Sequence, residues 1–150
     1  MNDLEQLGEW LTPHLNKLGN AARRRLTAAI ARDLRRSNQQ RIKQQVEPDG
    51  TPFAPRAPLR SQRGRLRRKG MFTKLRQTKH LRISSSPNAA SVQLLSRAGR
   101  IAAVHHYGLR DKVTPDGPEH HYPSRELLGF SRVDQERILD QVYQLIGSGK

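Results

Sequence analysis

The sequence predicts an α+β protein with a long N-terminal helix, a small antiparallel sheet with an extended basic loop, and a C-terminal helix packed on the sheet. Three observations lead to this class: a helical apolar period in the N-terminal third, short apolar runs separated by turn residues after residue 80, and a second helical period after residue 130. At 150 residues the chain has the length of one domain. We expect a single domain over 1–150, made of a helical arm (1–47), a basic Pro/Arg-rich loop (48–70) and an α+β core (71–150).

The N-terminal third carries apolar residues at spacings of three and four, the period of an amphipathic helix. Thr12-Pro13 is expected to start the main helix, because Thr is a favoured N-cap and Pro is tolerated at the first helical position. The helix should run for about 30 residues, until Pro48-Asp49-Gly50 ends it by turn chemistry. A helix of that length usually packs against partners as well as against its own domain. The apolar stripe is Leu15, Leu18, Ala22, Leu26, Ile30 and Leu34, continued less regularly by Ile42 and Val46.

Short apolar runs in the second half predict three strands. Leu81-Arg82-Ile83 and residues 91–95 flank Ser86-Pro87-Asn88, a pattern typical of two strands joined by a turn. The run Ile101–Tyr107 is expected to form a third, central and buried strand, because its apolar residues are uninterrupted and Gly108 stops it. The loop over 109–119 should then leave the sheet and return beside it.

The segment Tyr122–Gly129 is expected to form a rigid corner before the last helix. Pro123 restricts the approach, and Arg125 and Glu126 are interpreted as a structural ion pair. Gly129 is expected to take a positive φ, which other residues rarely adopt.

The last helix is expected to begin after Ser131, which is a favoured N-cap, with Asp134 placed for the positive helix end. Its apolar stripe is Val133, Ile138, Val142, Leu145 and Ile146.

Composition limits how compact the chain is. Only 34% of the residues are hydrophobic and the mean hydropathy is −0.83, so we expect part of the chain to be extended or ordered by neighbours. The absence of cysteine excludes disulfides and thiolate metal sites. No apolar run approaches the ~20 residues of a membrane span, and the N-terminus carries acids where a signal peptide would be basic. We therefore expect a soluble, intracellular protein with no membrane contact.

Positive charge is concentrated in one segment. Fourteen of the 28 Lys and Arg residues lie between Gly50 and Arg110, a stretch without any Asp or Glu. Its most basic part, Arg60–Lys69, has no apolar period and is expected to become ordered only on binding. Such a segment would attract polyphosphate, with an affinity that falls as salt rises, but no aromatic stacking platform or helix-turn-helix accompanies it.

Candidate catalytic and metal sites are weak. His105-His106 and His120-His121 offer imidazoles for zinc, but neighbouring strand residues point to opposite faces and no acid or cysteine completes a closed set. Ser124, His121 and Asp116 can be grouped as a triad, yet no Gly-x-Ser-x-Gly elbow or phosphate-binding Gly loop is present. The sequence therefore predicts no enzyme activity, no metal and no cofactor.

Several motifs occur in an order that carries a resemblance. They are His105-x-x-Gly108, Tyr122-Pro123-x-Arg125, Leu127-Leu128-Gly129, the string Gln-Gln-Val-x-Pro-Asp-Gly-Thr-Pro-Phe-Ala-Pro at 44–55, and Met71-Phe72-x-Lys74-Leu75-Arg76. Over roughly Arg36–Ile146 the chain resembles the phage virion morphogenesis family, the tail completion proteins of contractile-tailed temperate phages of the gene product S type.

The resemblance implies a non-enzymatic tail completion or terminator protein that makes tails competent for head–tail joining. It implies a homo-oligomeric ring, six-fold like the tail tubes of such phages, located in the virion at the head-proximal end of the tail and assembled in the host cytoplasm. Its implied partners are further copies of itself, tail tube and sheath proteins, and head–tail connector proteins. The residues assigned to assembly and partner binding are Arg60, Arg63, Arg65, Arg67, Arg68, Lys69, His105, Tyr107, Gly108, Tyr122, Pro123, Arg125, Leu128 and Gly129.

The alternative from another class is a small basic nucleic-acid-binding protein that contacts the phosphate backbone non-specifically. It accounts for the charge but leaves the long helix and Tyr122–Gly129 without a role. Gel filtration at low and high salt separates the two, because oligomers stable to salt favour assembly and salt-sensitive DNA binding favours the alternative.

Overall fold

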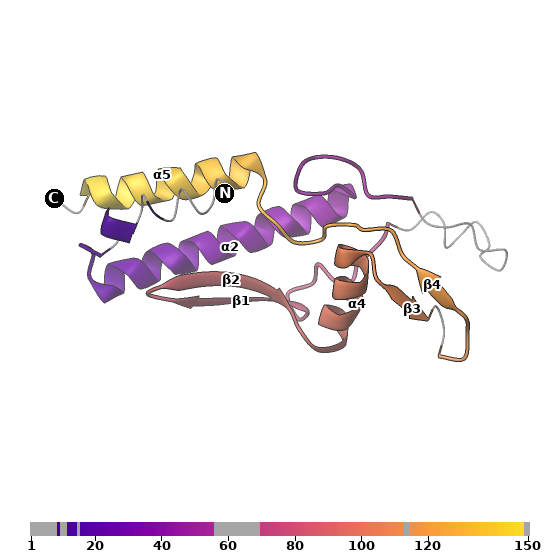
Figure 1. The fold of residues 1–150 in the computed structure, drawn as a ribbon. Coiled ribbons are helices and arrows are strands. Elements are labelled where there is room, and N and C mark those ends of the chain that lie inside the picture. The colour runs from indigo at the N-terminus through magenta and orange to yellow at the C-terminus, as the bar shows by residue number, and fades with distance from the viewer. Residues whose placement is uncertain (1–8, 10–11, 15, 56–69, 113–114, 149–150) are drawn as a thin grey trace. The chain divides into compact units, whose positions relative to one another are not determined.

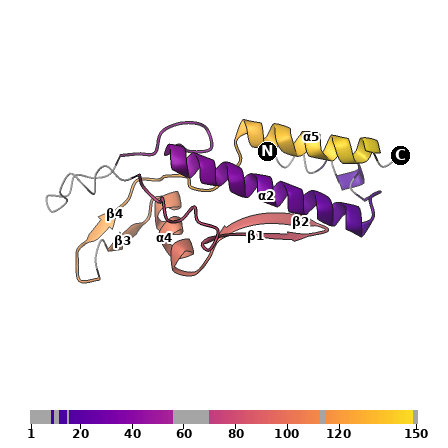
Figure 2. The same ribbon diagram turned by 180° about the vertical axis from the view of Figure 1, so that it is seen from behind.

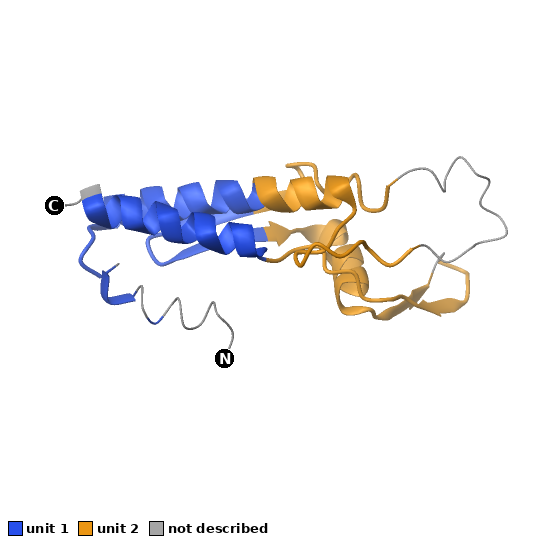
Figure 3. Cartoon of the chain, turned by 90° about the horizontal axis from the view of Figure 1, so that it is seen from above, with its two compact units in different colours: residues 1–35, 83–92, 130–150 blue, residues 36–82, 93–129 orange. Residues whose placement is uncertain are grey.

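The computed structural model describes residues 9, 12–14, 16–55, 70–112 and 115–148 (Figure 1). Their order confirms the α+β class. The helices and strands are α2 (Asn20–Gln44), β1 (Leu81–Ser86), β2 (Ala89–Leu94), α4 (Ser96–Tyr107), β3 (Arg110–Lys112), β4 (Glu119–His121) and α5 (Arg132–Ser148). The chain divides into two compact units (Figure 3): unit 1 contains 1–35, 83–92 and 130–150, and unit 2 contains 36–82 and 93–129.

Unit 1 is built on the first part of α2. Leu26 and Val142 are buried against each other between α2 and α5, with Ile30, Leu145 and Ile146 packed around them. On α2, Thr27 Oγ1 donates a 2.7 Å hydrogen bond to the Ser86 carbonyl at the end of β1. Both views of the ribbon show α5 running along one side of α2 and the β1–β2 hairpin along another (Figures 1 and 2). The contacts that seat α5 are therefore with α2.

The long helix begins later than predicted. Residues 12–14 are helical, but a turn follows over 16–18 and α2 begins only at Asn20. The Gly19 carbonyl accepts the first bond of the new helix from Arg23 N, at 3.0 Å. Gly is a poor residue inside a helix and an acceptable one at its N-cap, so Gly19 restarts the helix rather than continuing it. At the other end Gln45 takes a φ of 61°, and the predicted turn over 48–50 follows.

The predicted strand over Ile101–Tyr107 is wrong, because these residues form the second half of α4. A four-residue apolar run fits a buried strand or a buried helix segment equally well. The evidence for a helix includes a residue before the run. Ala98, upstream of it, and Ala102, within it, are both buried, at 6% exposure each. Their spacing of four places them on one helix face. Gly108 then ends the helix as its left-handed C-cap, with a φ of 65°.

The strands that the structure describes form two hairpins rather than one three-stranded sheet. β1 and β2 confirm the predicted pair with its turn at Pro87-Asn88. β3 and β4 are antiparallel, with Asp111 opposite His120. The chain after Gly108 therefore leaves as β3 and returns as β4 beside it, in a two-stranded sheet separate from the β1–β2 pair. Among the described residues, no helix is both long and apolar enough to cross a membrane.

Unit 2 has its own small apolar core. It consists of Phe53, Leu75, Ala98, Ala102 and Leu127, with Met71, Phe72 and Leu94 packed against it. Each of these residues comes from a short or irregular piece of chain or from α4. The core therefore brings together segments that have little regular structure of their own.

The start of α5 confirms the predicted cap. Ser131 Oγ accepts a hydrogen bond from Asp134 N at 3.0 Å, and Asp134 Oδ2 accepts one from Ser131 N at 2.9 Å. This reciprocal pair satisfies two backbone donors at the helix end. Val133, which was expected on the buried stripe, is 53% exposed, whereas Val142 is buried.

A series of Asp substitutions in α4 tests the corrected element. Ala98→Asp and Ala102→Asp should each lower the free energy of unfolding by about 3 kcal/mol, because a charge would enter the core without a partner. Ile101→Asp, at a position 38% exposed, should be far better tolerated. The measurement is urea unfolding. A destabilising Ile101→Asp together with a harmless Ala98→Asp would show a different periodicity and rule out the helix.

Candidate functional site

The segment Tyr122–Gly129, which carries the sequence resemblance, is an extended piece of chain without helix or strand. Its backbone is tied to the C-terminal end of α4. Arg125 N donates to the His105 carbonyl at 2.7 Å, and Tyr122 N donates to the Leu109 carbonyl at 3.1 Å. The Ser124 hydroxyl adds a 2.8 Å bond to the His106 carbonyl. The end of α4 and the residue after Gly108 therefore position the first half of the segment, residues 122–125.

Arg125 is the central side chain of this region and is 97% buried, with 3% exposure. Its Nε donates to the Ala54 carbonyl at 2.7 Å and its Nη2 to the Pro55 carbonyl at 2.9 Å. A third bond, of 3.3 Å, runs from Nη1 to His105 Nδ1. The sequence predicted Glu126 as its partner, but these bonds go to two backbone carbonyls and an imidazole. The planar fork of a guanidinium suits such divergent acceptors better than a single ammonium does.

His105 is half-buried and accepts from Arg125 through Nδ1, which requires an unprotonated ring nitrogen. Burial, assisted by the Arg125 charge, lowers the pKa of His105 from its ordinary 6.5 to about 4, against a smaller opposing effect of Asp111. The imidazole packs against Tyr122, with 4.6 Å between ring centroids, and against Phe72, with 4.7 Å. At neutral pH His105 is therefore an uncharged member of an aromatic cluster.

The two glycines of the motifs are required for different reasons. Gly108 has a φ of 65°, and a Cβ there would lie 2.9 Å from Ser124 N. The expected positive φ at Gly129 is wrong, because among the described glycines Gly50 and Gly108 are the ones with a positive φ. Gly129 is instead required for space, since a Cβ would come within 2.7 Å of Pro48 Cγ. Close approach, rather than a turn, explains the glycine.

Two buried polar residues of α2 hold Gly129, and the sequence analysis missed both. Asn38 Oδ1 accepts from Gly129 N at 3.0 Å, and Arg41 Nη2 donates to the Gly129 carbonyl at 2.6 Å. Arg41 Nη2 also donates to Asn38 Oδ1 at 2.6 Å. A signal was present, because Asn38 stands four residues after Leu34 and four before Ile42, where the apolar stripe would continue.

The remaining predicted site residues differ in how exposed they are. Tyr107 is 70% exposed, Pro123 is exposed and Leu128 is half-buried. The neighbouring Leu127 is the residue that enters the core, at 1% exposure. The cations of 60–69 lie outside the described residues, and so does the expectation that they become ordered on binding.

Of the four paired histidines, His105 and His120 pack on the same Tyr122 ring, whereas His106 and His121 make hydrogen bonds elsewhere. His106 Nδ1 accepts from Leu127 N at 3.2 Å, and His121 Nε2 lies 2.9 Å from the Gly108 carbonyl. His120 packs on Tyr122, with 4.8 Å between ring centroids. In the part of the chain that the structure describes, no three His, Cys, Asp or Glu side chains gather in a way that could hold a metal ion.

A cavity of about 430 Å³ opens beside His105 and Tyr122, between α4 and the β3–β4 hairpin. Its lining includes Arg97, Arg100 and Lys112, the acid Asp111 and the apolar Ile101. Charged and apolar groups thus meet in one hollow, a combination that suits contact with another protein surface.

Replacement of Arg125 tests whether its guanidinium organises this region. Arg125→Lys should lower the free energy of unfolding by about 2–4 kcal/mol, because one ammonium cannot serve three divergent acceptors. Arg132→Lys is the matched control, since its side chain is 93% exposed and should change stability by less than about 0.5 kcal/mol. Thermal melting compares the two. Equal melting temperatures for both variants would contradict the assigned role.

The lowered pKa of His105 predicts how stability depends on pH. Between the ordinary pKa of 6.5 and the folded value of about 4, the unfolded chain binds the extra proton, so stability falls as pH is lowered through this window. His105→Asn keeps an acceptor but cannot titrate, and should lose less stability over the same window. Denaturant unfolding at several pH values measures both profiles. Parallel profiles would show that His105 is not held neutral by the fold.

Known proteins resemble this chain over nearly its whole length, the motif residues included. The chain matches the phage virion morphogenesis family over residues 2–146. It is 40% identical over 141 residues to the tail completion protein S of Escherichia phage P2. The aligned residues are 92% of this chain and 93% of the P2 protein. No solved structure matches it. Because both matches extend over nearly the full length, the chain belongs to the phage virion morphogenesis family.

Proposed function

We propose that this protein completes phage tails. It acts without catalysis, as a ring of identical subunits at the head-proximal end of the tail, and makes the tail competent to join a head. The observation that carries the proposal is the 40% identity to the P2 tail completion protein over 92% of the chain. Identity at that level over nearly the whole length supports a shared role as well as a shared fold.

Exposed apolar residues support an assembling subunit. Tyr107 and Leu109, on either side of Gly108, are 70% and 46% exposed. In unit 1, Val133 and Tyr143 are 53% and 54% exposed. Such side chains, in a chain with two small cores, gain stability when a neighbour covers them. Repeated head-to-tail contacts of one chain close into a ring, and six-fold closure would match the tube on which it sits.

Within this proposal the segment Tyr122–Gly129 sets the geometry of the subunit contact. It is held by Arg125 at its centre and by the Asn38–Arg41 pair at its end. Its neighbours Tyr107 and Gly108 belong to the same motif set. A segment with this many fixed backbone groups keeps one conformation, which a closed ring needs because an error in one contact recurs in all of them.

The partners of the ring are proposed to be tail tube and sheath proteins below and head–tail connector proteins above. The cations of 60–69, together with His105, Tyr107, Tyr122 and Leu128, are assigned to these contacts. This places the protein in the virion, in a tail assembled in the host cytoplasm.

Mass measurement of the purified protein tests the ring. Light scattering after gel filtration should give six times the 17.1 kDa subunit mass, and the species should survive high salt because its contacts include apolar surface. Negative-stain imaging with purified tails should place it at the head-proximal end. A salt-sensitive monomer that binds duplex DNA would favour a nucleic-acid-binding protein instead.

Substitution at Gly129 tests the geometric role. Gly129→Ala should cost about 1–3 kcal/mol, because the new Cβ overlaps Pro48, and should lower the yield of rings by more than its melting temperature accounts for. Gly147→Ala in α5 is the control, since nothing lies within 4 Å of its Cβ position, and it should be neutral or slightly stabilising. Rings from Gly129→Ala in normal yield would show that the segment does not set the contact.

A further inference from the structure

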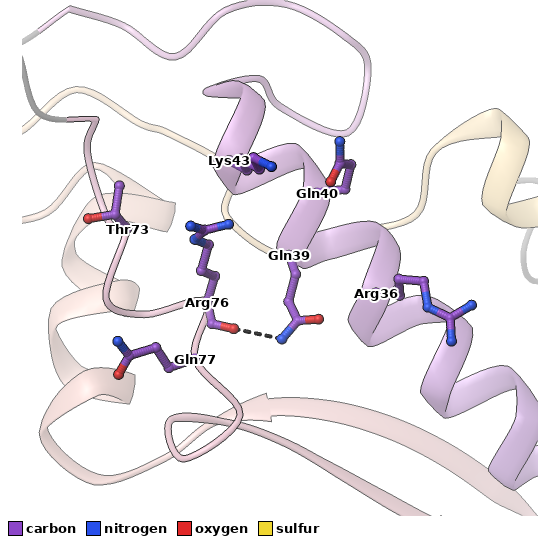
Figure 4. A pocket seen from close by; sticks show the side chains of 7 residues that line it. All are labelled: Arg36, Gln39, Gln40, Lys43, Thr73, Arg76 and Gln77. Atoms are coloured by element: carbon purple, nitrogen blue, oxygen red, sulfur yellow. Dashed lines mark hydrogen bonds between the residues drawn. The ribbon is translucent and has the colours of Figure 1, made fainter.

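A second pocket lies in unit 2 and shares no lining residue with the cavity beside His105. Its volume is about 380 Å³, and its described lining side chains, drawn in Figure 4, are all charged or polar residues. One wall is the C-terminal part of α2, with Arg36 and Lys43, and the other is the turn-rich segment around Arg76. None of the seven described lining residues is acidic. Because Arg36, Lys43 and Arg76 surround one pocket, their positive charge favours an anionic ligand.

The other lining residues are uncharged and polar, and they are Gln39, Gln40, Thr73 and Gln77. The amide nitrogen of Gln39 donates to the Arg76 carbonyl at 2.7 Å, which ties the two walls together (Figure 4). Its amide oxygen keeps the capacity to accept from another group. The pocket therefore offers one amide held by a hydrogen bond, that of Gln39, as well as positive charge.

The spacing of the α2 wall matches an extended peptide. Arg36 and Lys43 are seven residues apart, so they share a helix face and are separated by about 10 Å along the axis. A peptide in the extended polyproline II conformation has three residues per turn, so every third side chain lies on one face, and three residues advance about 9 Å. Carboxylates on every third residue of such a peptide therefore repeat at nearly the same interval.

The amides distinguish between the two common kinds of anionic polymer. A phosphate backbone presents acceptors only, so the amide oxygens of the pocket would gain no partner from it, whereas a peptide also brings N–H donors. No aromatic ring is among the described lining residues to stack on a nucleobase. We propose that this pocket binds an acidic peptide segment of a partner protein. The carboxylates pair with Arg36, Lys43 and Arg76, and the peptide backbone bonds the glutamine amides.

This inference goes beyond the proposed function, because its test needs neither a ring nor a tail. The probe is a labelled peptide with Glu at every third residue, followed by fluorescence anisotropy with the full chain. The same peptide with Gln in place of Glu should bind far more weakly. Comparable binding of the two peptides would overturn the proposal.

Charge reversal locates the binding. Lys43→Glu and Arg76→Glu should each weaken binding of the Glu peptide by about tenfold or more. Lys74→Glu is the matched control, because Lys74 is exposed and lies between Thr73 and Arg76 without lining the pocket. It should change affinity by less than about twofold. An equal loss with Lys74→Glu would show diffuse attraction and overturn the pocket as the site.

An amide substitution separates a peptide site from a phosphate site. Gln40→Ala should weaken the Glu peptide and leave binding of duplex DNA unchanged, and as Gln40 is exposed the variant should fold normally. If duplex DNA or inorganic phosphate binds in a way that Lys43→Glu abolishes, and the Glu peptide does not bind, the pocket is a phosphate site and the proposal fails.

Discussion

The bonds of the Arg125 guanidinium hold unit 2 together. They join the chain at Ala54 and Pro55 to the end of α4 at His105 and to the segment that carries Arg125 itself. Burial of a guanidinium costs several kcal/mol unless its donors are satisfied, so the fold around it must keep these acceptors in place. The same charge helps to keep His105 neutral, which lets the imidazole accept a hydrogen bond and pack among aromatic rings. The buried Arg125 charge thus helps to determine the protonation state of His105 and the position of the carbonyls around it.

This arrangement follows from a shortage of apolar residues. Only 34% of the residues are hydrophobic, and the apolar cluster of unit 2 around Leu127 contains five buried side chains. Hydrogen bonds therefore contribute part of the stability that holds the irregular segments in place. Asn38 and Arg41 illustrate this on α2, where the buried face turns from apolar to polar and binds the backbone of Gly129 instead of packing against a side chain. Such bonds are directional, and they specify one conformation more strictly than apolar contacts do.

The distribution of charge has two separate consequences. The cations of 60–69 form a dense run in the sequence, whereas Arg76 lies more than thirty residues after Arg36 and Lys43 and joins them at one pocket only because the chain folds. A dense run attracts any polyanion, and its attraction is screened by salt. A pocket that adds the hydrogen-bonded Gln39 amide to three cations is proposed to select among anions by shape and by hydrogen bonding. The two features therefore serve different kinds of recognition within the proposed assembly.

The sequence by itself determined the elements whose signals are local. The pair of strands around Pro87-Asn88, the cap formed by Ser131 and Asp134, and the α+β class all depend on neighbouring residues, so their patterns could be interpreted directly. Motif order along the chain also indicated the family. The tertiary structure decided what depends on distant partners. Ile101–Tyr107 is a helix because Ala98 and Ala102 face the unit 2 core. Gly129 lacks a side chain because Pro48 occupies that space, and Arg125 chooses the carbonyls of Ala54 and Pro55 because folding places them, some seventy residues away, within hydrogen-bond distance.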